Sequence, residues 1–246
     1  MDFYHRLSAY YDEIFPARKE EMRFVRNLLA GRRRVLDIGC GTGNKTAAMN
    51  LDAEVTAFDA DPGMIETAER LHASTGIRYA VLDMLRMDEA FMPASFDAAL
   101  CLGNTLAHLV HPGDLSAFLR LTRGLLTDEG AFVAQILNYD RITLQGVSAL
   151  PLIETEHAVF RRNYDWRGGE MHFVTELTDK ADGATYRNDI VLLPILKSSL
   201  DSLLGESGFG LIEHYGSYAG EPFQSDSFHL IVRAFADKRR ASCRQP

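Results

Sequence analysis

The first half of the chain alternates short apolar runs with segments whose apolar residues recur every three or four positions. Short runs rich in branched and aromatic residues are typical of buried strands, and they lie at 35–38, 54–58, 78–82, 96–102 and 131–137. Helical spacing is found at 17–29, 44–49, 62–74 and 112–126. Strands that alternate with helices predict a parallel sheet covered by helices.

Two of these helices begin with a recognisable signal. Pro62 and Pro112 suit the first helical turn, where the missing N–H group costs nothing. Asp61 is predicted to cap the helix that Pro62 begins, because its side chain can accept a hydrogen bond from a free backbone N–H.

After residue 137 the pattern changes to apolar and polar residues in alternation. Three antiparallel strands are expected at 157–166, 171–178 and 185–193, joined by glycine-containing turns at 167–169 and 182–183. A helix at 196–206 and two strands at 210–218 and 227–235 follow. The second half therefore predicts an antiparallel sheet inserted before the last elements of the parallel one.

Composition narrows the class of protein. The 246 residues, 46% of them hydrophobic, suffice for a full core. The net charge of -8 argues against a nucleic-acid surface, which needs clustered Lys and Arg. No apolar run approaches the ~20 residues of a membrane span. We therefore expect no nucleic-acid or membrane partner.

The positions of the cysteines and histidines bear on the cellular location and on metal binding. The three cysteines are far apart with no CxxC pair, and no secretory leader is recognised, so a cytoplasmic location is expected. The eight histidines are scattered without metal-ligand spacing, so we predict no metal site.

Three glycines, Gly39, Gly41 and Gly43, follow the first strand. In an open parallel sheet, ligands bind at the carboxyl ends of the strands. Glycine there permits positive φ and lets a ligand approach the backbone without a Cβ in the way. The corner is therefore predicted to bind a small molecule.

Two ligand classes compete for this corner. A dinucleotide fingerprint needs Gly or Ala where Asn44 stands. Asp37, at the strand end, suits a cationic ligand better than a pyrophosphate. Asp59 ends the second strand, twenty residues after Gly39, where a carboxylate can accept hydrogen bonds from ribose hydroxyls in either class.

Three motifs in series, "VLDIGCGTG" at 35–43, "VTAFDADPGM" at 55–64 and "VLDM" at 81–84, resemble the class I S-adenosylmethionine-dependent methyltransferases. The resemblance covers residues 35 to about 137 and implies an enzyme with S-adenosylmethionine as cofactor. The implied fold is α/β, a Rossmann-like seven-stranded sheet, mostly parallel with its last strand antiparallel, carrying an inserted antiparallel sheet.

The same resemblance implies roles for individual residues. The glycine loop wraps the methionine part of the cofactor, Asp59 holds the ribose, Met64 packs on the adenine, and Asp83 with Met84 holds its amino edge. Met64 as an ordinary core residue and Asp83 as a helix cap are the alternatives. The complete predicted cofactor set is Tyr11, Arg18, Asp37, Gly39, Cys40, Gly41, Gly43, Asp59, Ala60, Met64, Asp83, Met84 and Leu102.

The acceptor side is expected at "CLGNTLAHL", 101–109. If a helix starts near Gly103, Asn104 and His108 lie at i and i+4 on one face. A neutral packed histidine, or one bound to a backbone carbonyl, is the alternative for His108. This run and "NYD" at 138–140 resemble the glycine and sarcosine N-methyltransferases.

That subgroup implies that Leu102 holds the cofactor through its backbone, while Asn104 and the Asn138–Tyr139 corner face a small amine. Asn104, His108 and Tyr139 are thus the predicted catalytic set. In the subgroup an arginine that grips the carboxylate of glycine precedes Asn-Tyr-Asp, and here that place is Leu137. Glycine is therefore in doubt, which leaves a more apolar amine, or an acceptor bound by an arginine among Arg141, Arg161 and Arg162.

The N-terminal stretch "YHRLSAYYDEIFPARKE", 4–20, resembles the lid of many such enzymes. Tyr11 would cover the sulfonium and Arg18 would pair with the cofactor carboxylate, with Lys19 as its rival. Simple anchoring of the terminus is the alternative for the tyrosines. Inserted aromatic residues, Tyr164, Trp166, His172 and Tyr186, either roof the acceptor or merely pack.

These observations divide the chain into a lid and helix (1–30), a cofactor-binding core (31–140), inserted strands on the acceptor side (141–194), a completion of the core (195–237) and a disordered tail (238–246). The predicted function is methyl transfer to a small molecule, at an amine nitrogen. A carboxylate or phenol O-methyltransferase, or a module that binds the cofactor without turnover, are the alternatives. The oligomeric state stays open, with a homodimer as one possibility.

Overall fold

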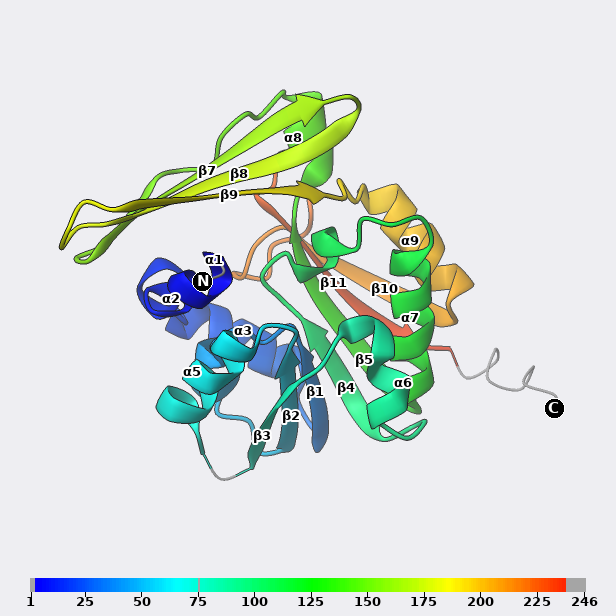
Figure 1. Cartoon of the computed structure of the whole chain (residues 1–246). Coiled ribbons are helices and arrows are strands. Elements are labelled where there is room, and N and C mark those ends of the chain that lie inside the picture. Colours follow the sequence, from blue (N-terminus) through cyan, green and yellow to red (C-terminus); the bar gives the residue numbers. More distant parts are fainter. Residues whose placement is uncertain (1–2, 75, 238–246) are drawn as a thin grey trace.

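The computed structural model describes residues 3–74 and 76–237 (Figure 1). The predicted disordered tail at 238–246 lies outside the described residues. The helices are α1 (Phe3–Ser8), α2 (Tyr11–Ile14), α3 (Lys19–Leu28), α4 (Asn44–Ala48), α5 (Pro62–His72), α6 (Met87–Ala90), α7 (Asp114–Leu125), α8 (Tyr139–Leu144) and α9 (Lys197–Glu206), with 3₁₀ helices η1 (Met84–Arg86) and η2 (Thr105–His108). The strands are β1 (Arg34–Ile38), β2 (Glu54–Asp59), β3 (Ile77–Val81), β4 (Phe96–Cys101), β5 (Leu126–Leu137), β6 (Ile153–Glu154), β7 (Ala158–Arg167), β8 (Glu170–Asp179), β9 (Thr185–Leu192), β10 (Phe209–Tyr215) and β11 (His229–Ala236).

A central sheet runs through the molecule in the order β10-β11-β5-β4-β1-β2-β3, seven strands within the described residues. β1 pairs in parallel with β2 and β4, while β11 is antiparallel to both β5 and β10. Parallel neighbours need crossover connections, and helices supply them here, whereas β10 and β11 follow one another directly and can pair antiparallel. The predicted fold class, including the antiparallel last strand, is confirmed.

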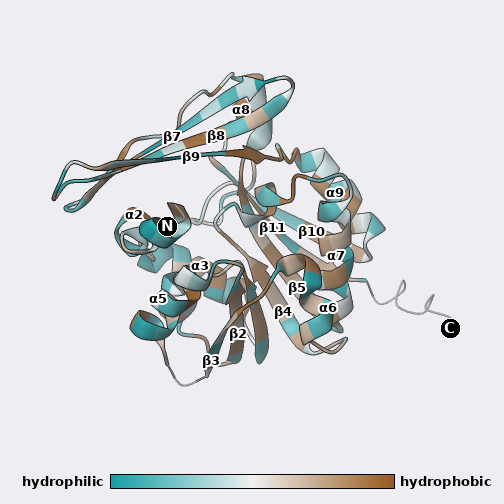
Figure 2. Cartoon of the chain, in the orientation of Figure 1, coloured by the Kyte–Doolittle hydropathy of each residue, from teal (hydrophilic) through white to brown (hydrophobic). Residues whose placement is uncertain are grey.

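The central sheet is buried on both faces, which explains its continuous apolar runs. α3 covers one face with Met22, Val25 and Leu28, and α6, α7 and α9 cover the other. Figure 2 shows apolar residues concentrated in the central strands and polar ones on the outer helices. The core therefore fixes the sheet and leaves its carboxyl edge for the site.

A second sheet, the inserted sheet, has the order β6-β7-β8-β9 in the part of the chain that the structure describes. Gly168 and Gly169, with φ of +59° and +90°, make the tight turn between β7 and β8, as predicted. β6 was not predicted, because two residues are too short for an alternating pattern. The inserted sheet lies across the lid helices α1 and α2 and the carboxyl end of the central sheet (Figure 1).

Several predicted boundaries differ from the structure by two or more residues, and two of these differences have a clear physical cause. β5 begins at Leu126, five residues before the predicted start, because the polar run at 127–130 hides the strand from a hydrophobicity pattern. α7 begins at Asp114 after a left-handed Gly113, so Pro112 lies outside the helix that it was predicted to open. Among the described residues no helix is long and apolar enough to cross a membrane.

Candidate functional site

The glycine loop after β1 can be built only from glycine at its key positions. Gly39, Gly41 and Gly43 have φ of +70°, +58° and +74°. A Cβ on Gly39 would lie 2.5 Å from Cγ2 of Thr105, and one on Gly43 would lie 2.6 Å from the hydroxyl oxygen of Tyr79. The loop therefore combines positive φ with close packing, and both exclude a side chain.

Backbone hydrogen bonds tie this loop to β2. The N–H groups of Gly39 and Cys40 both donate to the carbonyl oxygen of Phe58, at 2.8 and 3.0 Å. The N–H of Gly41 donates to Oδ2 of Asp59 at 2.9 Å. The loop and the end of β2 thus form one rigid corner.

Backbone hydrogen bonds orient the Asp59 carboxylate but leave part of its hydrogen-bonding capacity free. Its Oδ1 accepts from the N–H of Asp61 at 3.0 Å, so each oxygen holds one backbone donor. A carboxylate offers about four lone-pair sites, which leaves one on each oxygen for a vicinal diol. Burial raises the pKa of Asp59. These features fit the ribose of the predicted cofactor, with Ala60 exposed beside it.

Asp37 lies beneath the loop and is 4% exposed. The hydroxyl of Thr46 donates to its Oδ2 at 2.6 Å. Burial raises the pKa of Asp37 to about 6, against the opposing effects of the Thr46 hydrogen bond and of the Lys45 charge. A buried carboxylate with one neutral donor favours a cation nearby. Lys45 already supplies one positive charge, and the cationic ligand beside Asp37 stays a prediction.

Lys45 is a residue that the sequence analysis missed. Burial lowers the pKa of its ammonium group, while the charges of Glu21 and Asp37 raise it. It is the second residue of α4, the helix that directly follows the glycine loop. The available signal was a lone lysine at the N-terminus of an otherwise uncharged short helix.

The adenine-side residues lie at the carboxyl ends of β2 and β3. Asp61 caps α5 by accepting from the N–H of Met64 at 3.0 Å, which confirms the predicted cap. Met64 itself is buried at 3% exposure. Oδ1 of Asp83 accepts from the N–H of Leu85 at 2.9 Å, so this residue does cap a helix, η1. Met84 is half-buried beside it, and the adenine contacts of all three stay predictions.

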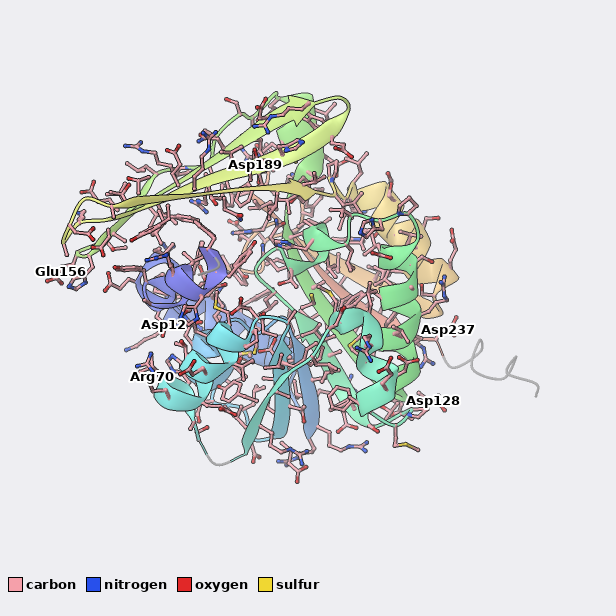
Figure 3. All side chains as sticks on the ribbon, viewed as in Figure 1. Asp12, Arg70, Asp128, Glu156, Asp189 and Asp237 are labelled. Carbon is pink, nitrogen blue, oxygen red and sulfur yellow. The ribbon has the colours of Figure 1, made fainter. Side chains whose placement is uncertain are left out.

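The lid helices close directly on the glycine loop. The ring of Tyr11 lies 3.3 Å from the position that a Cβ on Gly41 would take. Asp12, labelled in Figure 3, accepts from the hydroxyl of Thr42 and pairs with Nε2 of His72 on α5 at 2.7 Å. The lid is thus held against the predicted cofactor pocket by polar contacts as well as by packing.

The lid also contacts the inserted sheet. The Tyr10 hydroxyl donates to Oδ2 of Asp179 at 2.7 Å. The ring of Phe15 packs edge-on against that of Phe160, with centroids 5.8 Å apart. Arg18, by contrast, is an exposed residue at the N-cap of α3, and its predicted pairing with the cofactor carboxylate stays a prediction.

One lid contact should depend on pH. Nδ1 of His157 lies 2.7 Å from Oε1 of Glu13, and this hydrogen bond raises the pKa of His157 and lowers that of Glu13. A raised histidine pKa contributes stability at low pH that is lost as pH rises through it. We expect thermal stability to fall slightly more from pH 6 to pH 8 in the wild type than in His157→Asn, the effect being small because both side chains are exposed.

The exposed His111 supplies the control for this lid prediction. Its variant His111→Asn should keep the wild-type pH profile. Identical profiles for His157→Asn and the wild type would mean that the contact with Glu13 adds nothing to the fold.

The acceptor corner differs from the predicted helix. Gly103 and Asn104 have φ of +76° and +70°, and only then does the short 3₁₀ helix η2 begin. At three residues per turn, Asn104 and His108 do not share the face that an α-helix would give them. The prediction of an i, i+4 pair was therefore wrong, because two successive left-handed residues turn the chain first.

Asn104 is instead joined to Tyr139. Its Nδ2 donates to the hydroxyl of Tyr139 at 2.9 Å, and its Oδ1 accepts from the N–H of Leu137 at 3.0 Å. Burial raises the pKa of Tyr139, which keeps the phenol neutral. His108 keeps contact with solvent, while desolvation by its surroundings lowers its pKa.

Asn138 was expected to face the acceptor and does not. It is fully buried, its side-chain oxygen caps α8 at the N–H of Arg141, and its Nδ2 donates to the carbonyl groups of Ser225 and Ser227. Both ends of its side-chain amide are thus engaged within the protein. Its role is to hold the corner that presents Tyr139.

Gln135 is a second residue that was missed, although a polar residue in the apolar run 131–137 was a signal. Its Oε1 accepts from the N–H of Gly103 at 2.9 Å and from the Tyr218 hydroxyl at 3.2 Å. Its Nε2 lies 3.0 Å from Nδ1 of His229, whose pKa burial lowers to about 4. Leu102, next to this group, accepts the Thr105 hydroxyl at its carbonyl.

Within the described ranges, no group of three or more His, Cys, Asp and Glu side chains is arranged to hold a metal ion. The residues that meet at the carboxyl edge are therefore a glycine loop, two carboxylates and a neutral polar corner. Such a set can bind a cationic nucleoside and orient a second small molecule beside it.

Comparison with known proteins supports this description. Residues 35–130 match a family model described as a methyltransferase domain. A glycine/sarcosine N-methyltransferase from Parasynechococcus marenigrum is 27% identical over 241 residues, which cover 94% of this chain and 82% of the relative. A ubiquinone biosynthesis O-methyltransferase from Xanthomonas campestris is 38% identical over 109 residues, 43% of each chain.

A solved structure shares the fold. The S-adenosylmethionine-dependent methyltransferase from Clostridium acetobutylicum superposes with a TM-score of 0.78 at 16% identity, over 96% of this chain and 100% of the other. The likeness therefore includes the inserted sheet as well as the core.

Proposed function

Because the chain is a class I S-adenosylmethionine-dependent methyltransferase acting on a small molecule, we propose that its acceptor atom is the nitrogen of an amine. One observation carries the choice of nitrogen. The likeness to the glycine/sarcosine N-methyltransferase spans 94% of the chain, including the acceptor side, whereas the likeness to the O-methyltransferase spans 43%. Specificity resides in the acceptor side, not in the shared core.

When bound, the cofactor supplies an electrophilic methyl group on a sulfonium whose sulfur leaves as a neutral thioether. Asp59 and the glycine loop are proposed to hold its nucleoside, and Asp37 to lie near its positive charge. Asn104 and Tyr139 are proposed to orient the acceptor. Such positioning can supply ~7 to 11 kcal/mol of the acceleration, so no protein nucleophile is needed.

An amine must lose its proton before its lone pair can attack. His108 suits this task, because its lowered pKa keeps the imidazole neutral at pH 7 and its side chain retains solvent access. The proton would move from the ammonium nitrogen to a ring nitrogen of His108 and then to water.

His108→Ala is expected to lower kcat about 100-fold, the low end of what a general base contributes, and to leave the Kd for S-adenosylhomocysteine unchanged. Stopped assays of S-adenosylhomocysteine release and calorimetry measure the two quantities. His111→Ala, an exposed neighbour, should change neither. Equal losses in kcat and in cofactor affinity would remove His108 from the acceptor side.

The choice of acceptor atom is tested by S-adenosylhomocysteine release over a panel of small amines, phenols and carboxylic acids. We expect turnover with amines. Turnover confined to phenols or carboxylic acids would replace the amine proposal by the O-methyltransferase alternative, for which the Xanthomonas relative is the argument.

A further inference from the structure

The inner face of the inserted sheet, which looks toward the lid and the core, carries one polar row. Along β7 this face presents Ala158, Phe160, Arg162 and Tyr164, since alternate residues share a face. Arg162 lies opposite Thr175 on β8, which lies opposite Asn188 on β9. These three residues form the polar row.

Apolar clusters lie on both sides of the polar row. Toward the tip of the sheet, Phe160 and Leu177 pack with Leu7 and Ile14 of the lid. Toward its other end, Tyr164 and its neighbours Met171, Phe173 and Leu192 join the main core. The polar row therefore spans the interval between the lid contact and the core contact.

Two buried hydroxyls at this place have no hydrogen-bond partner within the described residues. They are Oγ1 of Thr175, a residue 2% exposed, and the hydroxyl of Tyr164, a residue 5% exposed. Buried polar groups are nearly always paired, and an unpaired one is costly. Their common position on the inner face suggests that a ligand completes them.

Arg162 lacks an acidic partner in the part of the chain that the structure describes. Its Nη2 donates to the carbonyl of Pro151 at 2.8 Å, its Nε has no acceptor, and its guanidinium lies 5.9 Å from the Phe15 ring centroid of the lid. Burial lowers the pKa of Arg162. A half-buried guanidinium with a free donor is suited to a carboxylate.

The polar row is connected to the acceptor corner through Tyr164. The phenol of Tyr164 interacts electrostatically with Tyr139 on one side and with Arg162 and Arg141 on the other. Tyr139 in turn holds Asn104. Tyr164 therefore lies within electrostatic range of both the proposed amine position and the Arg162 guanidinium, although within the described residues no hydrogen bond joins its hydroxyl to either.

Resting on the proposed function, we infer that the acceptor is an amino acid whose carboxylate is bound by Arg162 together with the hydroxyls of Thr175 and Tyr164. In this proposal, Arg162 takes over the task of the arginine that the glycine and sarcosine N-methyltransferases have at the position of Leu137. The proposed carboxylate site lies on the inserted sheet, whereas Asn104 and Tyr139 follow the carboxyl ends of β4 and β5. A series that runs from glycine to ω-amino acids therefore varies the number of bonds between the acceptor nitrogen and the carboxylate.

The test compares glycine, β-alanine and γ-aminobutyrate with their carboxamides as acceptors. In the wild type we expect kcat/KM for the best amino acid to exceed that of its carboxamide by about 10- to 100-fold, the effect of one charge-assisted contact. Arg162→Met should abolish this preference, and Arg162→Lys should restore part of it, since a lysine keeps the charge without the fork.

Arg161→Met is the matched control, because Arg161 is the exposed neighbour on the outer face of the same strand. It should keep the wild-type preference. Thermal unfolding of each variant separates folding defects from binding. Equal rates on acids and carboxamides, or a preference that survives in Arg162→Met, would overturn the inference while the amine proposal stands.

A binding measurement decides the matter without turnover. Calorimetric titration of acetate into the complex with S-adenosylhomocysteine should give binding in the wild type and in Arg161→Met, and at least tenfold weaker binding in Arg162→Met. If no amine is methylated, the proposed function fails, and this titration still tests the carboxylate site. The site would be refuted if acetate bound to none of the three proteins, or if it bound equally to the wild type, Arg161→Met and Arg162→Met.

Discussion

Replacing Asp59 by alanine is expected to weaken the binding of S-adenosylmethionine and of S-adenosylhomocysteine by roughly 100- to 10,000-fold. The substitution removes the acceptor of the Gly41 and Asp61 N–H groups and the two lone pairs left for ribose hydroxyls. Hydrogen bonds to a charged group contribute about 1.5 to 3 kcal/mol each, and two of them correspond to this loss at about 1.4 kcal/mol per tenfold. Isothermal titration calorimetry measures it directly.

Asp61→Ala provides the comparison. It removes the cap of α5, the hydrogen bond to the Met64 N–H, and should lower the free energy of unfolding by about 1 kcal/mol with little effect on cofactor affinity. Asp59→Asn, nearly isosteric, should lie between the wild type and Asp59→Ala. If calorimetry shows that Asp59→Ala binds both nucleosides as the wild type does, Asp59 is no ribose ligand.

Replacing Gly39 by alanine is expected to lower the free energy of unfolding by about 3 kcal/mol. The φ of +70° costs an L-residue about 1 to 2 kcal/mol, and a Cβ only 2.5 Å from Cγ2 of Thr105 adds an overpacking cost of about 1 to 3 kcal/mol. For a chain of this size, that lowers Tm by about 6 to 12 °C. Thermal unfolding followed by circular dichroism gives the value.

Gly168→Ala separates the two costs. Gly168 also has positive φ, +59°, but a Cβ there would meet nothing within 4 Å, so only the conformational cost applies. Thr105→Ser removes the clashing methyl and should rescue part of the loss in Gly39→Ala, a positive coupling in a double-mutant cycle. Equal destabilisation by Gly39→Ala and Gly168→Ala would exclude the steric explanation.

The surroundings of Leu137 explain why an arginine does not fit at this position. Leu137 is 9% exposed and belongs to the main core cluster, while its backbone N–H holds Asn104. A long cation at this position would need to leave the core. The proposed relocation of the carboxylate site to the inserted sheet therefore agrees with the local packing.

Short-range patterns predicted most of the core. The apolar runs of β1, β2 and β4 and the capping of α5 by Asp61 were readable because each depends on neighbouring residues. The extra residues of β5 and the two-residue β6 were not, because their strand conformation comes from pairing with Phe96 and Phe160 rather than from their own composition. The left-handed Asn104 was missed for a similar reason, since the Tyr139 hydroxyl that holds it lies 35 positions away.

By itself, the sequence determined the alternation of strands and helices, the glycines of the loop after β1 and the carboxylates at the strand ends, because periodicity and φ restrictions act over a few residues. Only the tertiary structure decided which side chains share the site. It turned the chain at Asn104 before the 3₁₀ helix that holds His108, used the Asn138 side chain to cap α8, and paired Arg162 with Thr175, whose buried hydroxyl has no partner among the described residues. These outcomes depend on contacts between residues far apart in the chain, and burial at those contacts determines which polar groups remain free for a ligand.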